Sequence, residues 1–225
     1  MALSSHTTGV AKVAIGSTEI AKISVGEALI WTAVEYSGVG AGVTGTTVPS
    51  FNVTAPVGAD VFVVAVSDRS AGTVTGITYG GVAMTQIASV DHNSDASRGT
   101  TKVFRLAKAG NGSAKSVVTT TGGLAWHAVN AFHWTGVSSV GTPVTTSGSG
   151  TALSQSIPGR GMHVFAAGNG GGNVGTIGSF SGVTHRATTG VASVLQALST
   201  TAGAGTAAAT LTASAPWSGV FIPIG

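Results

Sequence analysis

Histidine and tryptophan gather in one short segment, Trp126–Trp134 (WHAVNAFHW), which is the first place to look for chemistry. On a β-strand alternate residues share a face, which puts His127 and His133 on one side and Trp126 and Trp134 on the other. Two histidines six residues apart on a strand lie about 20 Å apart, too far to bind one metal ion together. The aromatic row is either a platform for a sugar ring or part of the core. We expect core, and burial of both tryptophans would exclude the platform.

A second candidate site is Asp91–Asp95 (DHNSD), where oxygen-bearing side chains stand at alternate positions, as in a calcium loop. An EF-hand loop needs Gly at its sixth position and Glu at its twelfth, but Ala96 and Lys102 stand there. An EF-hand is therefore excluded, and a looser Ca²⁺ site in a loop stays open. Asp, Asn and Ser are also turn formers, and we favour a solvated turn.

A third candidate is Gly40–Gly45 (GAGVTG), which matches the G-x-G-x-x-G pattern of dinucleotide-binding loops. That site needs a strand before the loop and a helix after it, so that the helix N-terminus meets the pyrophosphate. Here Pro49 follows closely and no helical periodicity appears, so we interpret the segment as a connector. We expect no cofactor.

Residues for catalysis are scarce. The chain has no cysteine and no G-x-S-x-G motif. Glycoside hydrolysis needs two neighbouring carboxylates, and the seven acidic residues show no such pairing in the sequence. They are Glu19, Glu27, Glu35, Asp60, Asp68, Asp91 and Asp95. We therefore expect no catalytic residue, no metal site and no enzyme.

The composition of the chain indicates which kinds of structure and which partners are possible for it. Of 225 residues, 8% are charged and 35 are glycine, and the mean hydropathy is +0.41. The longest apolar run, Val61–Val66 (VFVVAV), is far shorter than the roughly 20 residues of a membrane-spanning helix, so we expect no membrane insertion. The ten Lys and Arg residues are spread along the chain, which argues against a nucleic-acid partner.

Short β-branched runs separated by Gly and Pro turns predict an all-β fold with one antiparallel β-sandwich. The best helix candidate, Val191–Leu198, has no N-cap and is interpreted as a strand. The expected strands are Ser50–Thr54, Asp60–Ser67, Val74–Tyr79, Val82–Ala88, Thr100–Leu106, Ala114–Thr121, Leu124–Trp134, Ala152–Ile157, Met162–Ala167, Ser193–Leu198, Thr206–Thr212 and Trp217–Ile224.

A repeat of ten residues stands near the N-terminus: Lys12–Ile20 is followed by Lys22–Ile30 and Trp31. Each copy predicts a strand, a Gly turn and a second strand, too small to hold a core. We therefore expect an attachment module (1–32), a Gly/Thr-rich linker (33–48) and the sandwich (49–225). The expected attachment residues are Ile15, Gly16, Ile20, Val25, Gly26, Ile30 and Trp31.

This repeat resembles a short module that begins many minor tail proteins of actinobacterial siphophages, in which a V-G-S-T segment is followed by a second V-G segment ending in Trp. The resemblance covers residues 12–31. A second resemblance spans most of residues 49–225 and rests on FNVTAPVGADVFVVAVSD (51–68), VTGITYGGVAMTQIASV (74–90) and APWSGVFIPIG (215–225). The stretch TKVFRLAKAGNGSAKSVVTT (101–120) carries it as well. This second resemblance is to a jelly-roll-like sandwich of phage tail and bacterial surface proteins, and it implies no catalytic residue.

Together these observations predict a non-enzymatic structural component of a tailed-phage virion, and within that class a minor tail protein. The N-terminal module would dock to the particle, and the sandwich would project outward. Expected partners are other tail or capsid subunits, further copies in a homo-oligomer, and a host cell-wall glycan contacted by Trp126 and Trp134. The expected location is the virion, assembled in the host cytoplasm. A capsid decoration protein and a host-glycan-binding module are the alternatives.

Overall fold

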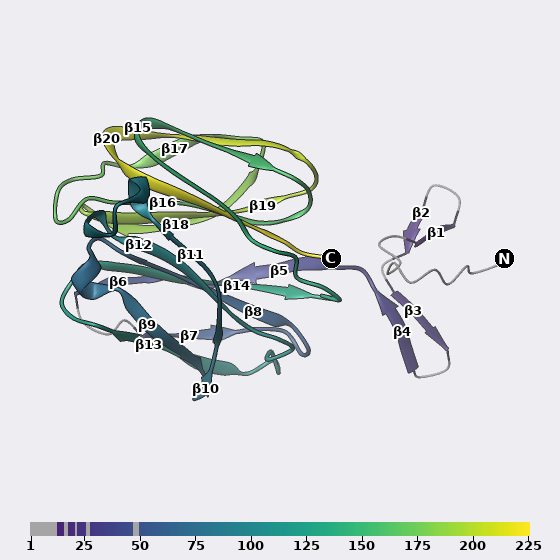
Figure 1. Ribbon diagram of the computed structural model, residues 1–225. Coiled ribbons are helices and arrows are strands. Elements are labelled where there is room, and N and C mark those ends of the chain that lie inside the picture. Colours follow the sequence, from purple (N-terminus) through teal and green to yellow (C-terminus); the bar gives the residue numbers. More distant parts are fainter. Residues whose placement is uncertain (1–12, 16–17, 21, 26–27, 47–49) are drawn as a thin grey trace.

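The computed structural model describes residues 13–15, 18–20, 22–25, 28–46 and 50–225. Within these ranges antiparallel strands carry the fold, and the helical segments are short 3-10 turns, Ser70–Gly72 (η1), His92–Ser94 (η2) and Ala96–Arg98 (η3). The predicted all-β class with sandwich packing is confirmed. The large sheets lie over one another as layers (Figure 1). None of the helical segments in these ranges is long and apolar enough to cross a membrane.

The middle layer is a six-stranded sheet in the order β11-β12-β8-β14-β5, with β6 also paired to β14. Its strands are β5 Glu35–Val39, β6 Val43–Gly45, β8 Asp60–Ser67, β11 Thr85–Asp91, β12 Thr100–Leu106 and β14 His127–Thr135. Phe62 and Val64 of β8 pack into one core cluster, whereas Val61 and Val63 pack into another. The VFVVAV run is therefore apolar throughout because both faces of its strand are covered.

One face of the middle sheet is covered by a four-stranded sheet in the order β10-β9-β13-β7. Its strands are β7 Ser50–Thr54, β9 Val74–Tyr79, β10 Val82–Ala83 and β13 Ala114–Thr121. Val53, Ile77 and Val117 point from it into the cluster that contains Val61. Polar and apolar residues alternate along β13, as expected for an outer sheet with one face toward water.

The other face is covered by a second six-stranded sheet in the order β15-β20-β16-β19-β18, with β17 also paired to β20. Its strands are β15 Val144–Ile157, β16 Gly161–Gly168, β17 Ile177–Ser181, β18 Thr184–Val191, β19 Val194–Thr201 and β20 Gly205–Pro223. Val164, Leu198 and Ile222 fill the cluster shared with Phe62.

The long strands β15 and β20 build a further core on the outer side of this sheet. They pair around a bulge between Gly150 and Ala152. Leu153 and Leu211, from their far halves, pack with Phe165 of β16. The structure thus adds a third core cluster to the single sandwich that the sequence predicts, and it joins the two expected strands Thr206–Thr212 and Trp217–Ile224 into β20.

Other segments also differ from expectation. The linker expected over residues 33–48 contributes β5 and β6, which pair with β14 at the edge of the middle sheet. The interpretation of Val191–Leu198 as strand is confirmed, since these residues lie in β18 and β19 with a tight turn between them. β17 and β18 were not expected.

The N-terminal repeat forms two hairpins in which β1 (Val13–Ile15) pairs with β2 (Thr18–Ile20) and β3 (Lys22–Val25) pairs with β4 (Ala28–Thr32). Each copy therefore contains two paired strands, as predicted, while the expected Gly turns between them (16–17 and 26–27) lie outside the described residues. Among the described residues each hairpin forms its own two-stranded sheet, separate from the large sheets (Figure 1).

Candidate functional site

The two tryptophans of the aromatic row have opposite surroundings. Trp134 is 1% exposed and packs between the middle sheet and the sheet of β16. Phe132 is fully buried beside it, so this part of the row is core, as we expected. Trp134 as a glycan contact is therefore wrong, because neighbouring side chains enclose its ring. Trp126 lies just before β14 and is 40% exposed, so its contact with a glycan stays a prediction.

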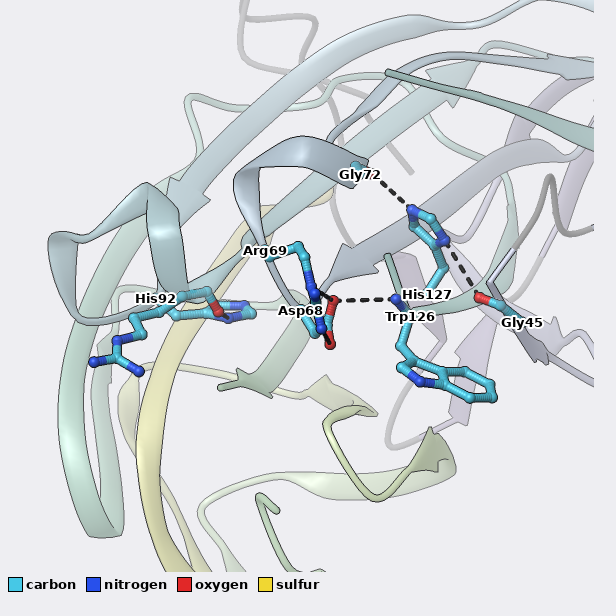
Figure 2. A network of polar contacts seen from close by, with 8 residues as sticks. Gly45, Asp68, Arg69, Gly72, His92, Trp126 and His127 are labelled. Carbon is cyan, nitrogen blue, oxygen red and sulfur yellow. Dashed lines mark hydrogen bonds and ion pairs between the residues drawn. The ribbon is translucent and has the colours of Figure 1, made fainter. Parts of the chain in front are cut away.

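Asp68 organises the loops around Trp126 (Figure 2). Its fully buried carboxylate accepts hydrogen bonds from Nε and Nη2 of Arg69 at 3.2 and 3.3 Å and from the Trp126 N–H at 3.1 Å. Its own N–H donates to the Trp126 carbonyl at 3.0 Å, and its carbonyl accepts from the Gly170 N–H at 2.7 Å. One buried residue thereby ties together the chain after β8, the chain before β14 and the loop after β16.

His127 fixes the same loops from the other side. Its Nε2 lies 2.6 Å from the Gly72 carbonyl oxygen, and its Nδ1 lies 3.3 Å from the Gly45 carbonyl oxygen (Figure 2). Gly72 packs so closely against the loop before β14 that a Cβ added at Gly72 would lie 2.0 Å from the Cβ of Ala125. The backbone that carries Trp126 is thus held on both sides.

The surface of this loop end combines apolar and hydrogen-bonding groups. Leu124 is 74% exposed and precedes Trp126 by two residues. Arg69 is partly exposed, and its hydrogen bond to Asp68 raises the pKa of its guanidinium. Arg98 donates to the side-chain oxygen of Asn169 at 3.3 Å. A partly exposed aromatic side chain together with donors and an amide at one end of the sheets suits binding of a polar ligand with apolar faces, such as a sugar. We name these residues (Arg69, Arg98, Leu124, Trp126 and Asn169) the loop-end surface.

His92 anchors the neighbouring turns to the third sheet. Its Nδ1 lies 3.0 Å from the Arg98 carbonyl, its Nε2 lies 3.0 Å from the Thr101 hydroxyl, and that hydroxyl lies 2.9 Å from the Ser218 hydroxyl. Burial lowers the pKa of His92 to about 4, so its ring is neutral at physiological pH. The chain of contacts makes His92 a structural residue.

The Asp91–Asp95 segment uses its carboxylates for turns. Asp91 accepts a hydrogen bond from the Thr100 hydroxyl at 2.9 Å. Asp95 accepts one from the Ser97 N–H at 2.9 Å, which caps η3. Hydrogen bonding to the Ser97 side chain, and then to its backbone, lowers the pKa of Asp95. These contacts support the favoured turn interpretation. Across the described ranges, no group of three or more His, Cys, Asp or Glu residues is arranged to hold a metal ion.

The other motif residues have local partners too. His133 lies with Nδ1 2.9 Å from the Ser37 hydroxyl, and burial lowers its pKa. In the glycine motif, Gly42 has a φ of +66° and packs so tightly that an added Cβ would stand 2.2 Å from the Thr189 hydroxyl oxygen. The second half of the motif, Val43–Gly45, is itself strand β6 and not the start of a helix, which removes the geometry of a dinucleotide site.

The expected attachment residues lie outside what the structure describes. Gly16 and Gly26 fall outside the described ranges, as do the side chains of Ile15, Ile20, Val25, Ile30 and Trp31. Their role stays a prediction.

Sequence reasoning overlooked the Asp68–Arg69 pair. A signal was available, because these two charged residues closely follow the fully apolar run of β8 in a chain with only seven acidic residues.

Comparisons with protein-family models, curated proteins and solved structures gave no match.

Proposed function

We propose that this chain is a non-enzymatic structural component of a tailed-phage virion, specifically a minor tail protein. In this proposal residues 1–32 dock to the particle, and the layered sandwich projects outward with the loop-end surface available to a ligand. The observation that carries the proposal is the doubled N-terminal hairpin, in which each copy of the repeat pairs with itself and with no strand of the large sheets in the described ranges.

Small hairpins are marginal on their own and gain stability by packing against other protein. Adding strands to a neighbouring subunit is a common way to achieve this. The repeat also carries the resemblance to the modules of siphophage tail proteins. Docking to a particle is therefore the role that best accounts for two such hairpins ahead of a well-packed core.

Deletion of residues 1–32 tests this proposal. We expect the truncated protein to give the far-UV circular dichroism of a β-protein and to be missing from purified particles. A control chain in which residues 1–32 are shuffled keeps the length and composition and should also be missing. Normal incorporation of the truncated protein would refute the docking role.

Binding of a host cell-wall glycan is a second candidate function, favoured by the exposure of Trp126 on a backbone held by Asp68 and His127. On a glycan array, Trp126→Ala should weaken binding by about tenfold or more, as loss of a central aromatic contact does. Val82→Ala is the matched control, because Val82 is an exposed apolar residue on the outer four-stranded sheet. Equal binding by both variants would exclude the loop-end surface.

A further inference from the structure

An open depression lies at the seam between the middle sheet and the sheet of β16, beside Trp134, whereas the loop-end surface lies at the other end of β14. Residues of β5, β14, β18 and β19 and of the turn before β16 line it. The side chains that matter for its chemistry are Glu35, Tyr36, Trp134, Arg160, Arg186 and Thr200. Two arginines in one depression are notable in a chain with only five arginines.

Arg186 is held in place by two contacts. Its guanidinium carbon lies 4.3 Å from the centre of the Tyr36 ring, a cation–π contact. Its Nε donates a hydrogen bond to the Thr200 hydroxyl at 3.0 Å. Since Nε is used in this way, the two terminal nitrogens of the fork remain for another acceptor.

Arg160, in the turn before β16, is held in a similar way. Its guanidinium carbon lies 5.9 Å from the centre of the Trp134 ring, and one of its terminal nitrogens donates to the Val34 carbonyl. Trp134 in turn packs edge-on against Tyr36, with ring centres 5.9 Å apart. The two arginines therefore rest on one connected aromatic pair.

The charges in this depression are unbalanced. Arg69, Arg98 and Arg105 each have an aspartate within 4 Å. Among the described residues, neither Arg160 nor Arg186 has such a partner. Among the described residues that line the depression, Glu35 is the one carboxylate, so two arginines and one glutamate leave a formal charge of +1.

We propose that this depression binds an oxyanion, a carboxylate or a phosphate group. Guanidinium forks match the oxygen geometry of both groups, and charge-assisted hydrogen bonds are stronger than neutral ones. Ordering the arginines beforehand removes part of the entropy cost of binding. A sugar ring is a poor occupant, because guanidinium groups already cover faces of Tyr36 and Trp134.

Titration of the full chain with sodium phosphate and, in a separate arm, sodium acetate tests the proposal. Both arms are compared with sodium chloride at equal ionic strength. The readout is the NMR shift of the arginine Nε–Hε groups. We expect one arm to shift Arg160 and Arg186 with a Kd of about 1 mM or tighter. The responsive arm tells phosphate from carboxylate.

Variants at each arginine make the test specific. Arg186→Gln and Arg160→Gln should each weaken binding by about tenfold or more, because each removes charged hydrogen bonds. Arg186→Lys keeps the charge but loses the fork, so it should also bind more weakly than the unaltered chain. Lys108→Gln, at an exposed lysine outside the depression and outside the loop-end surface, is the matched control and should bind normally. No binding in either arm, or undiminished binding by folded Arg160→Gln or Arg186→Gln, would overturn the proposal.

Discussion

The two tryptophans of WHAVNAFHW show how position on a strand decides the fate of a side chain. Trp134 lies within β14, where sheets cover both faces. Trp126 precedes the first residue of β14, and its side chain is only partly covered, with 40% of it exposed. Residue type and spacing place the two rings on one side of a strand, but they do not tell where the strand begins. This is why the sequence predicted the core and left the surface contact undecided.

Replacing each tryptophan by alanine should separate these roles. Trp134→Ala should lower the free energy of unfolding by about 3–5 kcal/mol, because it leaves a large cavity between two sheets. Trp126→Ala should change it by only about 0.5 kcal/mol, as a partly exposed position does. Urea denaturation followed by circular dichroism measures both. Equal losses would contradict the burial difference.

Two buried histidines should make the fold sensitive to acid. Burial lowers the pKa of His92 to about 4 and that of His163 to about 3. Histidines of the unfolded chain take up protons below pH about 6.5, so unfolding binds protons in this range. The stabilising contribution is therefore complete above pH 6.5 and is lost as the pH falls toward the folded values.

Between pH 7 and pH 5 each of these histidines should remove about 2 kcal/mol from the free energy of unfolding. Urea denaturation at the two pH values measures the loss. His163→Gln keeps an amide that can pair with Gln155, the partner of His163. This variant should take up about one proton fewer on unfolding, so its free energy of unfolding should depend less steeply on pH. An unchanged pH dependence in this variant would show that His163 does not contribute.

At the scale of elements, the turn η1 and the chain before β14 hold each other in place. Gly72→Ala would bring its Cβ to 2.0 Å from the Cβ of Ala125. Because one of the two segments must move, we expect a loss of about 1–3 kcal/mol in the free energy of unfolding. Gly76→Ala is the matched control, since a Cβ there meets nothing within 4 Å. Equal stability of the two variants would count against the tight contact.

Asp68→Asn should loosen three loops together. The substitution removes the charge that pairs with Arg69 and leaves one oxygen where two now accept hydrogen bonds. Hydrogen exchange should become faster at the amides of Trp126 and Gly170, which both bond to Asp68. Amides in the centre of β8 should exchange as before. Unchanged exchange at the two loop amides would remove Asp68 from its organising role.

Several strands could be predicted with exact bounds. Asp60–Ser67 and Thr100–Leu106 agree with β8 and β12, and Ser50–Thr54, Val74–Tyr79 and Ala114–Thr121 agree with β7, β9 and β13, because turn residues flank these runs. The strand predicted over Leu124–Trp134 begins only at His127, since nothing in its sequence marks the start. The sequence does not predict β17, which pairs only with the outer part of β20, or β18, which is an edge strand with few apolar residues. Pro216 also hid the continuity of β20, since proline within a sheet is usually a sign of an edge or an end.

The candidate sites depend on contacts that the sequence does not encode locally. Arg160 and Arg186 are 26 positions apart and meet only because β18 and the turn before β16 face the same seam. No motif joins them with Tyr36. Trp126 was predicted because it belongs to a visible aromatic cluster, whereas the oxyanion site emerges only from the stacking of sheets.

At the scale of the whole molecule, the scarcity of charge becomes more marked after folding. Asp60 is 1% exposed and pairs with Arg105 at 2.6 Å, and Asp68 is fully buried beside Arg69. Two of only seven acidic residues are therefore withdrawn from the surface. A surface with so few charges is poorly protected against association. Neighbouring subunits in a particle would cover it, since the cores of interfaces are depleted in charge.

The assignment to the tail of a virion can be tested by electron microscopy of purified phage particles labelled with an antibody raised against the sandwich (residues 49–225). We expect label at the tail of intact particles, at a repeated and fixed position. Label on the head would instead favour the capsid decoration alternative. Particles that carry no label, while the same antibody detects the chain in the infected cell, would contradict the assignment to the virion.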